Sequence, residues 1–190
     1  MIEERLYGDF DYVPEELIPE AHLELSMNSI DLKTRWQRCG IISDLVAGYI
    51  SASYPEAGFG YTSPVFNSIS TVFQELIENA AKFSRHREAV VRIRIKHYNR
   101  VLKLEVQNDA TPTFGEKFEQ HIKTLFATPD LDALQVHILE NRTQADSHQS
   151  GLGLLMLLKD YPVKLGVMLV RSAPEREVIT VRVYYHVEAD

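Results

Sequence analysis

Hydrophobic residues recur at the spacing of an α-helix in three parts of the chain. The first part runs from Lys33 to Tyr54, the second from about Pro64 to Ser84, and the third from near Leu152 to Asp160. Apolar side chains that repeat every three or four residues lie along one side of a helix. Prolines follow the first and third parts, and proline does not continue a helix. The pattern therefore predicts three helices, each with an apolar side.

Elsewhere the chain alternates between apolar and polar residues in the manner of β-strands. The alternating runs are His22–Ser26, 90–98, 100–108, 163–172 and 177–187. The last four runs predict two hairpins, with turns at Asn99–Arg100 and at Pro174–Arg176.

The segment 110–149 is polar and interrupted by prolines, and two short helices fit near Glu116–Phe126 and Leu131–Gln144. The order of elements is then helix, helix, hairpin, irregular segment, helix and hairpin, with no linker long enough to divide the chain. This order predicts a single α/β (α+β) two-layer sandwich, in which a mostly antiparallel sheet carries its helices on one face.

The composition narrows the class of protein. Of the residues, 45% are hydrophobic, which allows a substantial core, and 20 basic against 27 acidic side chains give a formal net charge of −7. This balance argues against a nucleic-acid surface, which needs a basic face. The basic stretch 85–100 alternates, and we interpret it as the solvent face of a strand pair. The single cysteine, Cys39, excludes an intrachain disulfide and a cysteine-rich zinc site.

Nothing in the sequence indicates export or a membrane. The first ten residues are acidic and too polar for a cleavable signal. No apolar run approaches the ~18 residues that span a bilayer. We therefore expect a soluble, cytoplasmic protein whose partners include neither a membrane nor a nucleic acid.

The stretch from Gln74 to Ser84 carries the strongest functional signal. Glu75, Asn79 and Lys82 follow one another at offsets of four and three, so a helix brings them to one side, apart from its apolar residues. A carboxylate, an amide oxygen and an ammonium group in one row suit a metal-bound polyphosphate. The alternative is an ordinary solvated helix face.

A second signal is the end of the strand 100–108, where Asn108 and Asp109 are followed by the small Ala110. An amide or carboxylate at a strand end can bind the edge of a base by hydrogen bonds, and a small neighbour lets a flat ring approach. The alternative is an ordinary Asn-Asp turn. A register change of one residue would exchange the roles of Asn108 and Asp109, so the sequence leaves that choice open.

A third signal is the sequence Gly151-Leu152-Gly153-Leu154 at the start of the third predicted helix. Glycines let backbone N–H groups approach an anion, and a helix N-terminus carries roughly half a positive charge. A lone GxG before a helix is weak support for a phosphate site, and the P-loop pattern GxxxxGK[ST] is absent from the sequence.

In this order the three motifs resemble those of the GHKL ATP-binding superfamily, whose Bergerat fold is shared by gyrase, MutL and the histidine kinases. QELIENAAK is similar to the N box, VQNDA to the start of the first glycine box, and SGLGL to the second. The resemblance covers roughly residues 62–187 of the single domain 1–190. It implies a histidine-kinase-like ATPase fold, with residues 1–61 as an N-terminal extension for dimer or partner contacts. Residues 111–149 would form the ATP lid.

The resemblance also implies a role for each matching residue, with ATP and Mg²⁺ as cofactors. Asn79 matches the asparagine that coordinates Mg²⁺, Glu75 the glutamate that activates the attacking hydroxyl or water, and Lys82 a position that contacts phosphates. Asn108 stands where the superfamily usually has the aspartate that binds adenine. The remaining nucleotide-binding positions are Asp109, Ala110, Gly151, Leu152, Gly153, Leu154 and, by a looser alignment, Thr180.

The whole chain is most similar to small bacterial, largely cyanobacterial, ATP-binding proteins related to the SiaB-type kinases, which are of the anti-sigma-factor kind. This similarity implies a protein serine/threonine kinase of a partner-switching signal transduction pathway. Its substrate would be a STAS-domain, anti-anti-sigma-like protein, and a PP2C-like phosphatase would reverse the reaction. It also implies a homodimer formed through the N-terminal region.

The chain departs from the superfamily in its first glycine box, where DxGxG is replaced by Asn108-Asp109-Ala110-Thr111-Pro112. Asparagine can still accept a hydrogen bond from adenine, but without the strength that a charge adds. This departure supports the alternative of a catalytically weak ATP-binding interaction module.

Two further hypotheses have less support. A histidine kinase needs a phosphoacceptor on a helix before the N box, and the only histidine there, His22, lies outside the helical region. The spacings of His121, His137 and His148 match no recognised zinc motif.

Overall fold

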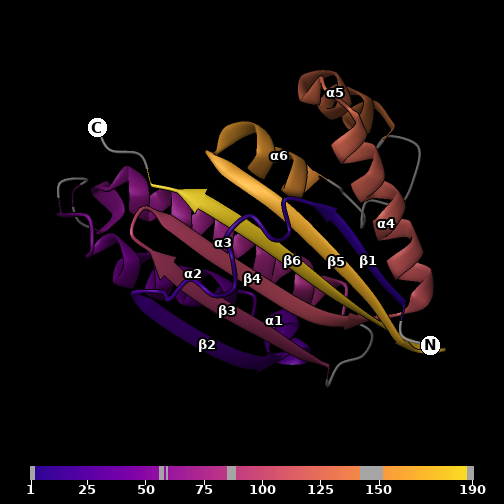
Figure 1. The fold of residues 1–190 in the computed structure, drawn as a ribbon, viewed down its shortest axis with the longest axis horizontal. Helices are drawn as coiled ribbons and strands as arrows, with labels where there is room; N and C mark the ends of the chain where they lie inside the picture. The colour runs from indigo at the N-terminus through magenta and orange to yellow at the C-terminus, as the bar shows by residue number, and fades with distance from the viewer. Residues whose placement is uncertain (1–2, 56–57, 59, 85–88, 142–151, 188–190) are drawn as a thin grey trace.

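The computed structural model describes residues 3–55, 58, 60–84, 89–141 and 152–187 (Figure 1). The elements follow in the order β1 (Glu3–Gly8), β2 (Ala21–Asn28), α1 (Ser29–Thr34), α2 (Gln37–Ser51), α3 (Pro64–Lys82), β3 (Val90–Tyr98), β4 (Val101–Ala110), α4 (Pro112–Ala127), α5 (Leu131–Asn141), α6 (Leu152–Asp160), β5 (Val163–Ala173) and β6 (Arg176–His186).

Within the described residues, six strands form one sheet in the order β1-β5-β6-β4-β3-β2, and all neighbouring strands are antiparallel. The two predicted hairpins are confirmed as β3–β4 and β5–β6. The strand predicted at His22–Ser26 is the central part of β2, which stands at one edge of the sheet. The other edge is β1, which the hydrophobic pattern did not predict.

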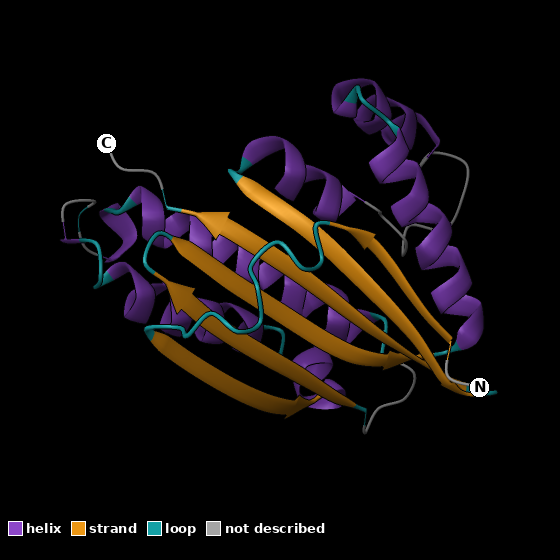
Figure 2. Cartoon of the chain, in the orientation of Figure 1, coloured by secondary structure: helices purple, strands orange, loops and turns teal. Residues whose placement is uncertain are grey.

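The helices share one face of this sheet, as predicted. Buried residues of all six described helices belong to a single hydrophobic core together with the inward side chains of the sheet, among them Phe73 of α3 and Val106 of β4. Figures 1 and 2 show α1, α2 and α3 behind the sheet, while the segment that connects β1 to β2 crosses in front of it. The fold is therefore α+β, with a helical layer on one face of an antiparallel sheet.

The helix α3 forms where its sequence carries both a start signal and an apolar side. The hydroxyl of Ser63 accepts a hydrogen bond from the backbone N–H of Phe66 at 3.2 Å, and Pro64 stands at the first helical position, where proline is favoured. Ile69, Phe73 and Ile77 are fully buried on the side that faces the sheet. The polar residues of the helix are thereby turned to its other sides.

Two predicted helices differ from the structure. The single helix expected over Lys33–Tyr54 is divided into α1 and α2, because Arg35 has the non-helical angles φ −126° and ψ 63°. The helix expected from Glu116 begins earlier, at Pro112, since Thr111 caps its first turn and proline is tolerated there. The predicted lid segment 111–149 thus contains α4 and α5, and residues 142–149 lie outside the described part.

The face of the sheet without helices carries most of the strand charges. Arg92, Arg94 and Lys96 lie on it, in agreement with our interpretation of the basic stretch, although each is partly buried. The connecting segment 9–20 covers part of this face, where the Tyr184 hydroxyl donates to the carbonyl of Phe10 at 2.6 Å. The N-terminal residues predicted as an extension therefore supply both edge strands and a cover for the open face.

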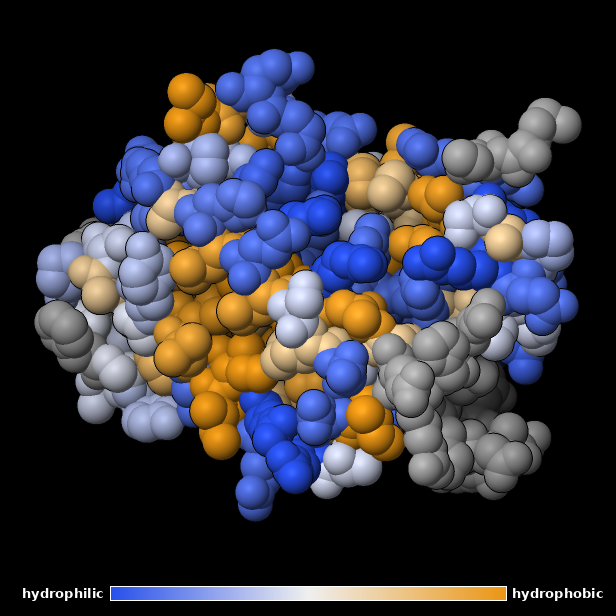
Figure 3. Space-filling view, turned by 90° about the horizontal axis from the view of Figure 1, so that it is seen from below, coloured by the Kyte–Doolittle hydropathy of each residue, from blue (hydrophilic) through white to orange (hydrophobic). Residues whose placement is uncertain are grey.

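The flank formed by α2 is apolar. Ile41, Leu45 and Tyr49 succeed one another at intervals of four residues and are each more than half exposed. Figure 3 views the molecule from the β2 side and shows hydrophobic residues gathered on this flank. None of the helices in the described ranges is long and apolar enough to cross a bilayer.

Candidate functional site

Glu75 and Asn79 of α3 meet the first turn of α6. A Cβ atom placed on Gly153 would lie 2.5 Å from Oε2 of Glu75 and 3.1 Å from Nδ2 of Asn79. Both distances are shorter than an ordinary contact, so a side chain at position 153 would displace the ends of these two side chains. The residues predicted from the first and third motifs are therefore brought together.

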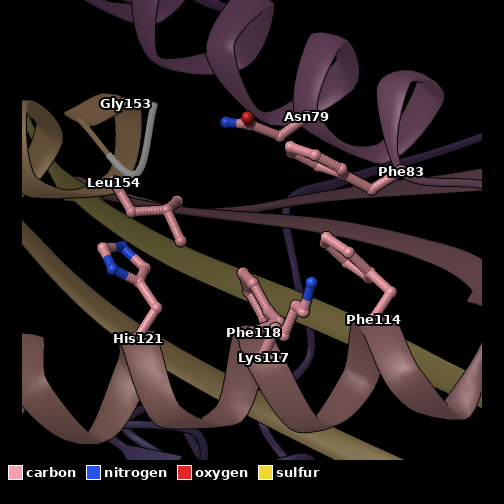
Figure 4. Close-up of a pocket in the computed structure, with 8 residues that line it drawn as sticks. All are labelled: Asn79, Phe83, Phe114, Lys117, Phe118, His121, Gly153 and Leu154. Atoms are coloured by element: carbon pink, nitrogen blue, oxygen red, sulfur yellow. The ribbon is translucent and has the colours of Figure 1, made fainter. Parts of the chain in front are cut away.

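A pocket of about 150 Å³ opens beside this meeting point (Figure 4). Its lining residues are Asn79, Phe83, Phe114, Lys117, Phe118, His121, Gly153 and Leu154. Figure 4 shows Asn79 and Phe83 reaching in from α3, Leu154 from α6, and the aromatic and basic side chains from α4 on the opposite side. The pocket is thus enclosed by three helices, with an amide, an ammonium and an imidazole on an otherwise apolar wall.

A much smaller pocket, the inner pocket, continues from this first or outer pocket toward the sheet. Its volume is about 20 Å³, and Asn108 is one of its lining residues. The two pockets share Asn79, Phe83, Phe114, Phe118 and Leu154. Asn108 is 5% exposed, and its Nδ2 has no hydrogen-bond partner among the described residues. A buried polar group left without a partner costs about 1–3 kcal/mol, so this amide is a feature that folding alone does not explain.

The structure decides between Asn108 and Asp109. Asn108 pairs with Ile179 in the register of β4 and β6 and shares the helix-covered face with it. Asp109 points to the opposite face, where it forms an ion pair with Arg176 at 2.9 Å. Asn108 is therefore the strand-end residue that reaches the pocket.

Thr180 also lies on the face without helices, because it stands between Ile179 and Val181, which both line the inner pocket. Its hydroxyl accepts a hydrogen bond from Gln107 at 3.1 Å. The structure thus does not bring Thr180 to the pocket, in contrast to the alignment suggested by the resemblance.

Four other predicted residues lie near the pocket without lining it, and the first is Glu75, whose carboxylate is beside Gly153. Lys82 is exposed, with its Nζ 5.4 Å from the ring centre of Phe83. Ala110 is fully buried in the core beyond Asn108, and Leu152 is buried at the start of α6. Leu154 lines both pockets. Gly151 lies outside the described residues.

The carboxyl group of Glu75 has a raised pKa. Burial contributes most, because it disfavours the charged form, and the nearby charge of Glu78 adds to the effect, while Lys82 acts in the opposite direction. Glu78 itself accepts a hydrogen bond from Gln74 at 2.7 Å. A carboxyl group with a raised pKa is a stronger base, which suits a proton acceptor in a catalytic site.

Sequence reasoning missed the contribution of α4. Phe114, Lys117, Phe118 and His121 follow one another at offsets of three, one and three, so they occupy one side of the helix. This spacing was a usable signal, because the pairs Phe114–Phe118 and Lys117–His121 are each four residues apart. No group of three or more metal-ligating side chains is found among the residues that the structure describes.

No model of a known protein family matches the sequence, and comparison with curated proteins finds no match.

Proposed function

We propose that the protein binds Mg²⁺-ATP between α3, α4 and α6 and transfers the γ-phosphoryl group to a serine or threonine of a partner protein. The observation that carries the proposal is the close approach of Gly153 to Glu75 and Asn79, of which Gly153 and Asn79 also line a pocket. That pocket continues to the buried amide of Asn108. Phosphoryl transfer from a nucleotide requires a base, a neutral oxygen ligand for the metal ion, a backbone site for the phosphates and a group that can bind the heterocycle.

This proposal places the chain in the GHKL superfamily, with a Bergerat fold, close to the small SiaB-like kinases. The proposed substrate is a STAS-domain protein in the cytoplasm, with a PP2C-like phosphatase acting in reverse and a homodimer as the working form. The support for this part is the resemblance of the three motifs and their convergence in space.

The residues present fit a magnesium-bound nucleotide on two counts. Gly153 lines the pocket and brings the backbone of α6 close to Glu75 and Asn79, and Asn108 offers a buried amide to a ligand. Asn79 would hold Mg²⁺ through Oδ1, and the ion would neutralise charge on the phosphate oxygens. The first backbone N–H groups of α6 and the ammonium of Lys117, rather than Lys82, would bind the phosphates.

Glu75 would accept the proton of the attacking hydroxyl. It lies one turn before Asn79 on α3, and its carboxylate is beside Gly153, which lines the pocket. Its raised pKa makes it a better proton acceptor than an ordinary carboxylate. A positioned base of this kind contributes about 10²–10⁴-fold to a rate.

The second candidate function is a nucleotide-binding interaction module without useful catalysis. It is favoured by Asn108, because a neutral amide binds a base more weakly than the carboxylate expected at that position. ATP binding without transfer to any partner would support this alternative.

The experiment that tests the proposal is transfer of label from γ-labelled ATP, with Mg²⁺, to a STAS-domain protein from the same source. We expect label on a serine or threonine, loss of label in Glu75→Ala with ATP binding retained, and loss of binding in Asn79→Ala. Asn67→Ala is the matched control, since Asn67 lies on the first turns of α3 and donates to the carbonyl of Tyr61. Full transfer by Asn79→Ala would contradict the role given to this residue.

The pH dependence gives a second test of Glu75. Because its pKa is raised, the rate of transfer should begin to fall on the acid side at a pH above the ordinary range of a carboxylate. Glu78→Gln removes one cause of the raised pKa, so the acid limb of kcat/KM should move to lower pH while the maximal rate stays the same. An unchanged acid limb would show that Glu75 is not the titrating base.

A further inference from the structure

The pocket beside Asn108 is too small for the ligand that the proposed function requires. A volume of about 20 Å³ holds roughly one water molecule, whereas a purine has nine heavy atoms in its two rings. The outer pocket is several times larger. Phosphates therefore have space at Asn79 and Gly153, but a base does not have space at Asn108.

Two aromatic side chains of α4 occupy the space beside Asn108 that a base would need. Phe114 and Phe118 line both pockets, and the ring of Phe114 is stacked on that of Phe83 with 4.5 Å between centres and 15° between planes. Phe118 continues the row at 5.9 Å from Phe114. Figure 4 shows the rings of Phe114 and Phe118 extending from α4 into the pocket, with the ring of Phe83 on the α3 side.

We propose that the first two turns of α4 are an autoinhibitory element, in which Phe114 and Phe118 occupy the base site and must leave it before a purine nucleotide can bind. This inference rests on the proposed function and adds to it a closed state of the same site. The unpartnered Nδ2 of Asn108, which is more than nine-tenths buried, is then a group that gains its partner only after the rings have moved.

The two sides of α4 are held by different kinds of contact. On the side away from the pocket, Glu119 is bound by Arg5 and Tyr7 of β1, and Glu116 by Arg171 of β5 at 3.2 Å. A Cβ atom on Gly115 would lie 2.7 Å from Cγ of Glu177, so the helix axis is close to β6 at this point. On the pocket side the contacts are aromatic and apolar. The charged contacts fix the helix on the sheet, and the rings are therefore the part that would have to move.

The opposite role for Phe114 makes the opposite prediction. If its ring stacked on the bound base, as aromatic side chains do in many base-binding sites, its removal would weaken nucleotide binding. If the ring blocks the site, its removal strengthens binding. The sign of the change in affinity therefore distinguishes the two roles.

The test is the dissociation constant for Mg²⁺-ATP, measured by calorimetry on the full chain and on three variants. We expect Phe114→Ala to lower the Kd about tenfold, because a stacked aromatic pair contributes roughly that factor to the closed state. Phe118→Ala should act in the same direction. Phe126→Ala is the control on the same helix, since Phe126 lies near Gly8 and lines neither pocket, and it should leave the Kd unchanged.

Each other outcome contradicts the inference in its own way. Weaker binding in Phe114→Ala would assign the ring to base stacking, and equal binding in all four proteins would show that α4 does not obstruct the site; both outcomes leave the proposed function standing. No binding by any protein would overturn the proposed function together with this inference. Phe114→Leu keeps an apolar side chain and removes the stacked ring, so it decides the matter if Phe114→Ala fails to fold.

Discussion

The pocket at α3 and the charged surface on the other face of the sheet differ in whether their buried polar groups have partners. On the open face, Glu105 is 4% exposed and is bound by Arg94 at 2.7 Å and by Arg182 at 2.6 Å. In the pocket, the equally buried Asn108 has an amide nitrogen without a partner in the described part of the chain. The difference separates polar residues that hold the fold from those that are available to a ligand.

On the charged surface, acidic and basic side chains pair with one another. Burial acts to raise the pKa of Glu105, but the two guanidinium groups together hold it below its ordinary value. Glu15 of the crossing segment lies within 3.2 Å of the cationic groups of Lys96, Lys103 and Arg182. Lys96 of the basic stretch, together with Lys103 and Arg182, therefore attaches the segment 9–20 to the sheet.

The largest effect in this comparison of partnered and unpartnered buried groups is expected from the removal of Glu105. Glu105→Ala leaves Arg182 buried without its main partner, and we expect the free energy of unfolding to fall by about 3–5 kcal/mol in urea titrations. The control is Glu24→Ala, because Glu24 pairs with Arg94 from a half-exposed position and should cost at most about 1 kcal/mol. Equal losses in the two variants would contradict the distinction between a buried and an exposed ion pair.

Removing the unpartnered amide of Asn108 should have the opposite effect on the free energy of unfolding. Asn108→Leu replaces a buried polar group by an apolar one of similar size, so we expect the free energy of unfolding to rise by about 1 kcal/mol. The same variant should bind Mg²⁺-ATP at least tenfold more weakly. Unfolding and calorimetry on one preparation test both parts. A loss of stability would mean that the amide holds the fold after all.

A smaller effect is expected from Glu15, whose pKa is lowered to about 2, first of all by its hydrogen bond with Lys103. A carboxylate whose pKa is lowered by folding stabilises the protein above its unfolded pKa, and this contribution is lost as the pH falls toward 2. Wild type should exceed Glu15→Gln by less than about 1 kcal/mol at pH 7, because the side chain is half exposed. The gap should close between pH 5 and pH 2, as followed by urea unfolding.

The neighbouring exposed residue supplies the control for this pH dependence. Glu16→Gln changes the same charge one position along the segment, and the gap from wild type should stay small at every pH. A gap for Glu15→Gln that widens on acidification would refute the assignment of the lowered pKa.

The smallest effect on nucleotide binding should come from Thr180. Since its side chain lies on the open face with Gln107, Thr180→Val should change the Kd for Mg²⁺-ATP by less than about twofold. Asn108→Leu, on the adjacent strand but the opposite face, is the comparison. A large loss of affinity in Thr180→Val would mean that the ligand reaches through to the open face.

The sequence predicts those parts of the structure that depend on local periodicity. The stripe of α3 and both hairpins follow from residues close together along the chain, whereas the approach of Gly153 to Asn79 joins distant parts of the chain and was expected from the resemblance of the motifs. By contrast, β1 alternates weakly over six residues and is fixed by long-range contacts, foremost its pairing with β5. The choice of Asn108 over Asp109 depends on which face the helices cover, and this is a property of the whole sheet.

Two further features needed the three-dimensional structure for similar reasons. In the sequence, Pro112 and Pro129 indicate an irregular segment over residues 110–149, although Pro112 begins α4. The pocket residues of α4 show a helical spacing, but only the docking of α4 on the sheet turns that side toward α3. Patterns along the chain therefore identified one wall of the site and not the opposite one.

The pairing of β1 with β5 has a consequence for how the protein is made. During synthesis, both edge strands leave the ribosome before their neighbours, since β2 pairs with β3 and Glu3 of β1 pairs with Arg171 of β5. The strand β2 cannot pair until β3 has been made, and β1 cannot pair until β5 has been made. Such long-range pairing favours slow folding. It also leaves strand edges unpaired for a time, and chaperones can bind such edges before the sheet is complete.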